Sequence, residues 1–221
     1  MEKLDFLYFK NDTKRKVKKI SLDQKFIAWK KDKEFYDGKR KNGYGGFKYD
    51  GRWLKILPKI IKEYNLTKNS TVLEIGCKKG FLLSDLKKLV PGIKCYGIED
   101  HLYPIKNCKA DVRKNIKFAK YDKIPFPKNK FDCIIAISSI YSYNFGDLIK
   151  IFNEMNRVSK SKKKIFITVA SYESEIDLRK FLQWSTLSTV ILNKSDWKKF
   201  FNKINYKGDY FFTTAKTLGI K

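Results

Sequence analysis

Apolar residues fall into two alternating kinds of segment from residue 54 to the end of the chain. Short, almost continuous apolar runs are typical of parallel strands whose two faces are both covered by helices. Such runs occupy residues 71–75, 94–99, 115–119, 132–138 and 164–170. Segments whose apolar positions lie three or four residues apart predict amphipathic helices. These segments occupy residues 53–64, 81–89, 103–110, 147–158 and 174–184.

The tail continues this alternation, with strand-like residues 189–192 and 210–214 on either side of a helix at 195–202. Strands that alternate with helices form a mostly parallel sheet, because each crossover returns the chain to the same edge. The pattern therefore predicts an α/β fold, with a sheet of about six to seven strands flanked by helices.

The first part of the chain differs from the rest. Residues 1–34 are polar and lysine-rich, and we expect one or two amphipathic helices that lie on the main domain. Their apolar positions are Leu4, Phe6, Leu7, Phe9, Ile20, Phe26, Ile27 and Trp29. Residues 35–53 hold five glycines and six aromatic residues, which predicts tight turns from which rings and Arg52 project toward a ligand. Residues 1–53 are thus expected to form a cap, and residues 54–221 the main domain.

Length and composition fit one domain without a membrane segment. A chain of 221 residues, 43% of them hydrophobic, can bury one full core. No apolar run approaches the ~20 residues that cross a bilayer, and the N-terminus lacks an apolar signal region, so we expect a cytoplasmic protein. The cysteines lack the paired spacing of a zinc or redox site, so buried reduced thiols and no metal are expected. They are Cys77, Cys95, Cys108 and Cys133.

The charge of the chain is strongly positive. Lys and Arg number 49 against 23 Asp and Glu, a formal net charge of +26, which also occurs in nucleic-acid-binding proteins. Nearly all the basic residues are lysine, whereas proteins that bind phosphates and bases usually employ arginine as well. A solvated lysine surface, of the kind that an AT-rich genome encodes, needs no partner. Nucleic acid is therefore an alternative partner and is not the favoured one.

A glycine turn follows the first strand. VLEIGCKKG (residues 72–80) places Glu74, Gly76 and Gly80 where a strand meets a helix, so the backbone can approach a ligand there. A dinucleotide site has a third glycine between these two, because pyrophosphate needs bare backbone. Here Lys78 occupies that position, which argues against NAD. A plain tight turn without a ligand is the alternative.

Two acids, Glu99 and Asp100, close the second strand about twenty residues after Gly80, where an acid can accept both ribose hydroxyls of a nucleoside. The segment NIKFAKYDKIPFPKNKFDCIIAISSIY (residues 115–141) then follows. Together with the glycine turn, it resembles class I S-adenosylmethionine-dependent methyltransferases. The resemblance covers residues 54–170 and implies a Rossmann-like fold that binds S-adenosylmethionine at the carboxyl ends of the first three strands.

In that family the segment after the third strand holds the adenine ring, often through an acid. Lys120 stands where this acid usually stands, and Tyr121 and Asp122 follow it. Arg52 is a candidate for the methionine carboxylate of the cofactor or for an anionic group of the acceptor. The expected cofactor-binding residues are Tyr49, Arg52, Glu74, Gly76, Cys77, Gly80, Glu99, Asp100, Tyr121, Asp122 and Ser138.

The candidate catalytic residues follow from the chemistry of methyl transfer. A hydroxyl acceptor must lose a proton, and His101, the only histidine, has an ordinary pKa suited to general-base catalysis. Tyr141 and Tyr143 follow the fourth strand, where family members place acceptor-binding groups, and Tyr143 is the second candidate. The residues expected to line the acceptor pocket from beyond the fifth strand are Tyr172, Glu173, Glu175 and Trp184.

The acceptor is predicted from a narrower resemblance. GYGGFKYDGRW (residues 43–53), NEMNRV (153–158) and YKGDYFF (206–212) are similar to a bacterial methyltransferase group associated with surface-polysaccharide gene clusters. This implies O-methylation of a sugar, glycan or sugar-linked metabolite. An RNA or protein methyltransferase is the first alternative, although SSIYSY lacks the Pro-Pro-aromatic motif of base-amino methyltransferases. A non-catalytic cofactor-binding homologue is the second, and the oligomeric state is left open.

Overall fold

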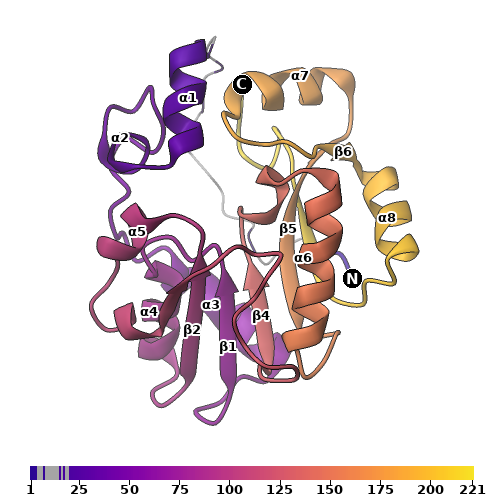
Figure 1. The fold of residues 1–221 in the computed structure, drawn as a ribbon. Helices are drawn as coiled ribbons and strands as arrows, with labels where there is room; N and C mark the ends of the chain where they lie inside the picture. Colours follow the sequence, from indigo (N-terminus) through magenta and orange to yellow (C-terminus); the bar gives the residue numbers. More distant parts are fainter. Residues whose placement is uncertain (4–6, 8–14, 16, 18–19) are drawn as a thin grey trace.

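The computed structural model describes residues 1–3, 7, 15, 17 and 20–221, and its centre is a parallel β-sheet (Figure 1). Its strands are β1 (Thr71–Ile75), β2 (Lys94–Glu99), β3 (Ile116–Phe118), β4 (Cys133–Ala136), β5 (Ile165–Tyr172), β6 (Leu192–Asn193) and β7 (Asp209–Thr213). Their order is β3-β2-β1-β4-β5-β6, with β7 also paired to β5, and every pairing is parallel. This confirms the predicted α/β fold with a Rossmann-like sheet.

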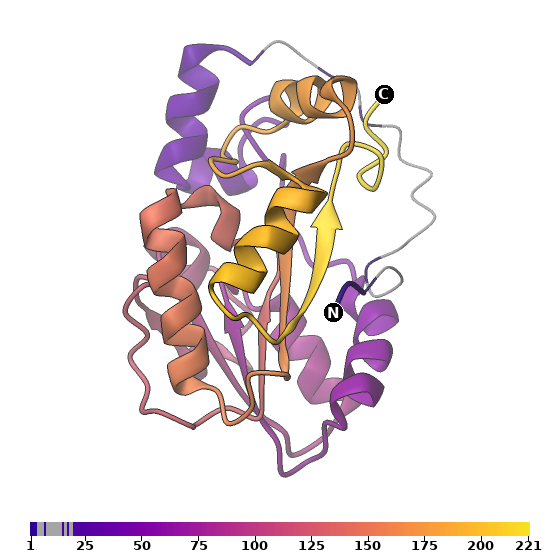
Figure 2. The ribbon, with the colours of Figure 1, turned by 90° about the vertical axis from the view of Figure 1, so that its right-hand side faces the viewer.

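Helices cover both faces of the sheet, because its strands are apolar on both sides. The helices of the main domain are α3 (Trp53–Tyr64), α4 (Phe81–Leu89), α5 (Leu102–Lys106), α6 (Phe145–Val158), α7 (Glu175–Trp184) and α8 (Lys194–Lys203). Val72 of β1 belongs to the same buried cluster as α3 and α4, whereas its neighbour Leu73 joins the cluster of α6 and α8. Figure 2 shows α3 and α6 on opposite sides of the sheet.

Several predicted elements are shorter in the structure, and two of them are shortened by local hydrogen bonds. The helix expected at 103–110 ends at Lys106, where the Asn107 side chain donates a hydrogen bond to the carbonyl of Tyr103. The strand expected at 189–192 is reduced to Leu192–Asn193. The amides of Thr189 and Val190 instead donate to the Tyr141 carbonyl, at 3.0 and 3.1 Å, and so cannot pair with β5.

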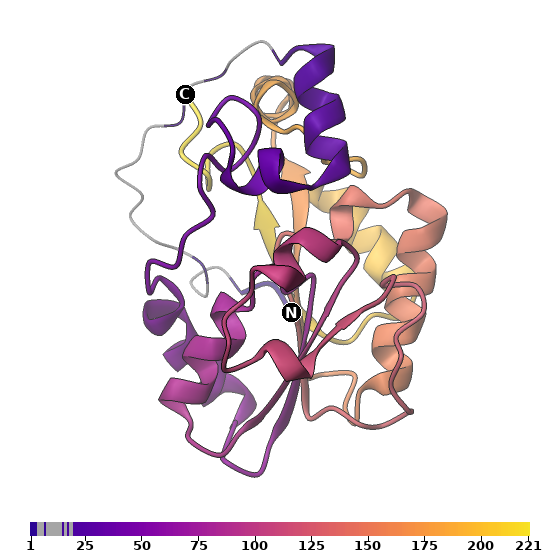
Figure 3. The same cartoon turned by 60° about the vertical axis from the view of Figure 1, so that its left-hand side comes forward.

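The N-terminal helices α1 (Leu22–Lys30) and α2 (Lys33–Asp37) lie above the carboxyl ends of the central strands (Figure 3). Ser21 and Gln24 form a capping box that starts α1, and the Asp32 carboxylate accepts the amide of Glu34 to start α2. Asp37 then joins the cap to the main domain. Its carboxylate accepts hydrogen bonds from Lys79 Nζ at 2.7 and 2.8 Å and from the Tyr103 hydroxyl at 2.7 Å.

The sequence suggested that the apolar residues of the cap lie on the main domain. The structure shows that not all of them do. Phe26 is 53% exposed and Trp29 is 72% exposed, so the prediction is wrong for both. Only Ala28 of α1 is fully buried. Lysines and apolar residues are interleaved along α1 (LDQKFIAWK), so its apolar positions are not confined to one face. Leu4, Phe6 and Phe9 lie outside the described residues.

The rings of the glycine and aromatic loop pack on one another and do not project toward solvent. Tyr36 and Tyr44 stack with ring centroids 5.6 Å apart, and Phe47 contacts both Tyr44, at 4.5 Å, and Phe81 of α4, at 5.1 Å. Phe35, Tyr36, Tyr44 and Phe47 therefore pack as one cluster and do not project singly from the loop. This loop forms a small core that attaches the cap to the main domain.

All four cysteines are free and buried, as predicted. Across the described residues, no helix combines the length and the apolar character that a membrane crossing requires.

Candidate functional site

The turn between β1 and α4 requires left-handed backbone at three of its five residues. Gly76 has φ +72°, Lys78 has φ +50° and Gly80 has φ +69°. A Cβ on Gly76 would lie 2.4 Å from the Ser139 Cβ, so only glycine lets the turn pass the loop after β4. The amides of Gly76 and Cys77 donate to the Ile98 carbonyl, at 2.9 and 3.2 Å, which fixes the turn beside the end of β2.

Three ionisable side chains meet where β2 ends. His101 Nδ1 lies 2.5 Å from Asp100 Oδ1 and 3.6 Å from Glu99 Oε1. Glu99 is buried, and its Oε2 accepts the backbone amide of Lys78 at 2.9 Å. The acid at the end of β2 is thus joined directly to the glycine turn, as the spacing in the sequence suggested. Oxygen and nitrogen atoms of the three side chains lie within 4.8 Å of one another, so the group also has the spacing of metal ligands.

Asp100 is the centre of a network of hydrogen bonds and charges that draws in three other segments. Its carboxylate accepts the Tyr143 hydroxyl at 2.5 Å and the Tyr121 hydroxyl at 3.2 Å, besides its contact with His101. Lys31 Nζ, at the end of α1, lies 3.8 Å away. The network therefore connects the cap with the loops after β2, β3 and β4.

Burial and these contacts shift the protonation of the cluster in opposite directions. Burial raises the pKa of Asp100, but His101, Lys31 and Tyr143 together lower it by more. The net pKa of Asp100 therefore lies well below the ordinary value. Burial raises the pKa of Glu99, and the neighbouring Asp100 charge adds to this. For His101, burial lowers the pKa while hydrogen bonds with Asp100 and Glu99 raise it more. Asp100 is hence the permanent anion of the group.

Glu74 is a fourth acid beneath the turn, and its surroundings are unusual. Its side chain is buried, and its Oε2 has no hydrogen-bond partner among the described residues. Burial raises the pKa of Glu74 to about 8, against the opposing effect of the Lys78 charge. A buried carboxyl group without a partner is costly to ionise, so Glu74 keeps its proton at neutral pH.

A cleft of about 650 Å³ opens beside this cluster. Helix α1 lines it with Leu22, Lys25, Phe26 and Trp29, and residues 186–189 add three side-chain hydroxyls and Leu187. Asp100, His101, Ser142 and Tyr143 complete the lining together with Lys31. Both catalytic candidates, His101 and Tyr143, therefore face the same space. The volume lies within the range of small-ligand sites.

Some of the residues predicted for cofactor binding have side chains that are engaged in other contacts. The Arg52 guanidinium bonds to the Asp50 carboxylate, with its closest contact at 2.6 Å, on an exposed surface. The Tyr49 hydroxyl donates to the buried carboxylate of Asp85 in α4 at 2.6 Å. Cys77 is buried under the turn, where its side chain packs against β2. These contacts occupy the side chains of Arg52, Tyr49 and Cys77.

Tyr121, Asp122 and Ser138 lie on the loops that surround the acids. Tyr121 reaches Asp100, as described above, and Asp122 Oδ1 is a buried oxygen for which the described residues supply no partner. Ser138 has φ +52°, and its amide donates to the Thr168 hydroxyl at 2.8 Å. The left-handed backbone at Ser138 turns its carbonyl toward the glycine turn, 3.5 Å from Lys78 Nζ.

The residues expected to line an acceptor pocket after β5 do not line the cleft. Glu173 bonds to Lys194 at 2.6 Å, Glu175 pairs with Arg179 on the surface, and Trp184 packs against Phe181. Tyr172 ends β5 beside β6. Thr186, Ser188, Thr189 and the exposed face of α1 line the cleft in their place, and none of them was predicted from the sequence. A run of Ser and Thr between two elements is the signal that could have identified the hydroxyl residues.

The chain is similar to a known protein family and to several known proteins. A family described as a methyltransferase domain matches residues 66–208. An uncharacterized protein of Methanocaldococcus jannaschii is 30% identical over 139 residues, 63% of this chain and 51% of that protein. A ribosomal RNA small subunit methyltransferase A of Mesomycoplasma hyopneumoniae is 32% identical over 108 residues, 48% of this chain and 40% of that enzyme. The chain thus spans about half the length, or less, of these relatives.

A solved structure agrees in fold. The YcgJ protein of Bacillus subtilis superposes with a TM-score of 0.55 and 18% sequence identity, covering 70% of this chain and 68% of that one. At this level of identity the similarity extends to the fold alone.

Proposed function

The chain belongs to the methyltransferase domain family, and on that premise we propose that it transfers a methyl group from S-adenosylmethionine to a small acceptor. The acceptor we propose is a sugar, glycan or sugar-linked metabolite, methylated on oxygen. The observation that carries this proposal is the junction of the glycine turn with Glu99, beside a cleft that contains His101 and Tyr143.

The residues present fit S-adenosylmethionine, which carries ribose hydroxyls, an adenine amine and positive charge. Glu99 stands at the strand end where its carboxylate would accept the ribose hydroxyls. The unpartnered, buried oxygen of Asp122 suits the adenine amine. The cofactor would supply an electrophilic methyl group, so the protein has to align the acceptor and exclude water.

The cleft has the composition of a sugar-binding site. Phe26 and Trp29 offer flat apolar faces, and the hydroxyls of Thr186, Ser188 and Thr189 are suited to the hydroxyl groups of a sugar. Lys25 and Lys31 add positive charge, which would favour an acceptor linked to a phosphate.

His101 is the residue we assign as general base. With Nδ1 bonded to Asp100, its other ring nitrogen is left to take the proton of an acceptor hydroxyl. Asp100 would orient the ring and stabilise the imidazolium that forms. Tyr143 is not suited to this role, because burial and the Asp100 charge raise the pKa of its phenol far above the ordinary value. Tyr143 instead donates to Asp100 and would hold the acid in place.

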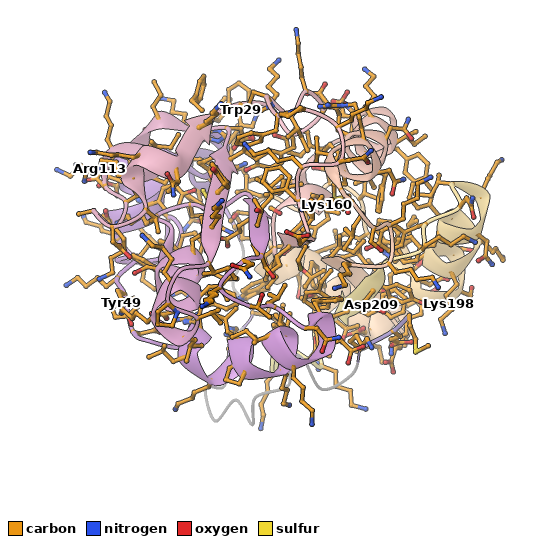
Figure 4. All side chains as sticks on the ribbon, turned by 90° about the horizontal axis from the view of Figure 1, so that it is seen from below. Trp29, Tyr49, Arg113, Lys160, Lys198 and Asp209 are labelled. Carbon is orange, nitrogen blue, oxygen red and sulfur yellow. The ribbon has the colours of Figure 1, made fainter. Side chains whose placement is uncertain are left out.

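An RNA acceptor is the second candidate, and the relatives support it. The ribosomal RNA methyltransferase described above aligns with nearly half of this chain. The charge of the chain is compatible with RNA, but Figure 4 shows nitrogen-tipped side chains on every side of the outline. A protein that binds a phosphate backbone would gather its positive charge on one face.

The proposed acceptor class can be tested by incubating the protein with labelled S-adenosylmethionine and panels of nucleotide-linked sugars, oligosaccharides and RNA. We expect label in a sugar compound, and we expect His101→Gln to reduce the transfer rate while leaving cofactor affinity unchanged. Label in RNA alone would replace the proposed acceptor with the second candidate. Cofactor binding without transfer to any panel would support a non-catalytic homologue.

A further inference from the structure

Lys78 occupies an unusual place in the glycine turn. It is the one residue with a side chain among the three left-handed positions, and such backbone is unfavourable for any residue other than glycine. Its side chain folds back over the turn. Nζ lies 3.4 Å from the Gly76 carbonyl oxygen, 3.4 Å from that of Ile137 and 3.5 Å from that of Ser138.

The three carbonyl oxygens form a subsite that suits an ammonium group. A primary ammonium has three N–H donors, and here three acceptors from the loops after β1 and β4 surround it. A sulfonium has no donor and would not satisfy these oxygens. All three contacts are long for hydrogen bonds, so the lysine is held loosely. Within the described part of the chain, no carboxylate lies within 4.0 Å of Nζ to hold it more firmly.

The Lys78 ammonium and the buried acids near it shift one another's pKa values. Burial lowers the pKa of Lys78, but its neighbours Tyr44, Glu99 and Glu74 raise it more, so the group stays charged. The Lys78 ammonium in turn opposes the effect of burial on Glu74 and Glu99. A bound ligand with its own ammonium group could take over this role. The flexible lysine chain could then move to solvent without leaving the acids uncompensated.

We propose that the Lys78 ammonium occupies the subsite for the α-ammonium group of S-adenosylmethionine and must withdraw before the cofactor binds. This proposal rests on the proposed function. Lys78 is thus an internal competitor. It lowers the affinity of the protein for every ligand that carries the α-amino-acid part of the cofactor, with its ammonium group. Ligands without that end do not compete with it. The observed affinity is reduced by the fraction of molecules in which the lysine is withdrawn.

The test is calorimetric titration of the parent protein and three variants with two ligands. S-adenosylhomocysteine carries the ammonium group, and 5′-methylthioadenosine is the same thionucleoside without the amino-acid end. Lys78→Met removes the charge and keeps a side chain of similar length, with the same strain at φ +50°. Lys78→Arg retains the charge. Lys87→Met is the matched control, because Lys87 lies in the last turn of α4 and donates to the Asp111 carbonyl.

We expect Lys78→Met to tighten S-adenosylhomocysteine by about tenfold, as for a competitor that is in place about nine-tenths of the time. Lys78→Arg and Lys87→Met should bind it like the parent, and 5′-methylthioadenosine should be unaffected by any of the changes. Binding of S-adenosylhomocysteine to Lys78→Met but not to the parent would be the extreme form of the same result.

Two outcomes would overturn the proposal while leaving the proposed function intact. One is unchanged or weaker S-adenosylhomocysteine binding by Lys78→Met, and the other is equal tightening of both ligands, which indicates a steric effect alone. If neither the parent nor Lys78→Met bound either ligand, the proposed function itself would fail, and this proposal with it. Thermal unfolding checks that the variant is folded, and Lys78→Gln replaces it if Lys78→Met is not.

Discussion

Buried charge at the end of β2 distinguishes this site at the residue scale. Glu74 and Glu99 are buried acids, Asp100 is held ionised by His101 and Lys31, and Lys78 supplies a nearby cation. Isolated buried charges are costly, so such a group persists where ligand binding or catalysis uses it. Each member can be tested by a single substitution.

Glu99→Gln should weaken S-adenosylhomocysteine binding by about 1.5–3 kcal/mol, because it removes charged hydrogen bonds to the ligand. The amide keeps the shape of the side chain, so the fold should be retained. Asp132→Asn is the control, since Asp132 precedes β4 at the amino ends of the strands, where its carboxylate accepts the Thr71 amide. Titration calorimetry would measure both. Parent-like affinity in Glu99→Gln would mean that Glu99 is not a cofactor ligand.

Glu74→Gln should stabilise the protein in alkaline solution. The pKa of Glu74 is raised to about 8, so its contribution to stability is complete below its unfolded pKa of about 4.3 and is lost as the pH rises through 8. Glutamine does not ionise and avoids this loss. We expect the free energy of unfolding of the variant to gain about 2–4 kcal/mol on the parent between pH 5 and pH 8.

Urea unfolding at the two pH values provides this measurement. The other shifted groups, Glu99 and His101, are present in both proteins and largely cancel from the difference. A difference that stayed constant with pH would show that Glu74 is ionised normally in the folded protein.

At the element scale, the sequence predicted the sheet well. The strands at 71–75 and 94–99 and the helices at 53–64 and 81–89 have the predicted bounds, because continuous apolar runs and regular helical spacing are local signals. The glycine turn and the acid after β2 were placed together for the same reason. Consecutive parallel strands have their carboxyl ends at one edge.

The cap and the acceptor side could not be predicted in the same way. The rings of residues 35–53 pack on one another through tertiary contacts, which a composition rich in Gly and Tyr does not reveal. Arg52 pairs with Asp50, two residues away, and this choice between a neighbour and a ligand has no periodic signal. Residues 186–189 reach the cleft only because Thr189 and Val190 bond to the Tyr141 carbonyl.

Asp37→Asn should loosen the cap from the main domain. Asp37 accepts hydrogen bonds from Lys79, Tyr103 and the amide of Phe47, and loss of its charge should weaken docking by about 1–3 kcal/mol. Hydrogen exchange of the α1 and α2 amides should then accelerate, while exchange in β1 and β4 should not. Asp32→Asn is the control, because asparagine caps a helix as well as aspartate does. Equal exchange in the two variants would argue against Asp37 as the anchor.

At the scale of the whole molecule, the net charge of +26 should produce only weak, non-specific attraction to RNA. We expect a dissociation constant for single-stranded RNA no tighter than about 1 µM at physiological salt, with little preference among sequences. Fluorescence anisotropy over a series of salt concentrations would measure it. Nanomolar binding that selects one RNA structure would favour an RNA acceptor over a sugar.

The central claim is that the glycine turn and the acids after β2 bind S-adenosylmethionine. Calorimetric titration of the parent protein with S-adenosylhomocysteine, with NAD in a parallel cell, tests it most directly. We predict micromolar binding of S-adenosylhomocysteine and no heat from NAD, because Lys78 stands where a pyrophosphate would need bare backbone. Binding of NAD, or of neither ligand by both the parent and Lys78→Met, would contradict this assignment of the site.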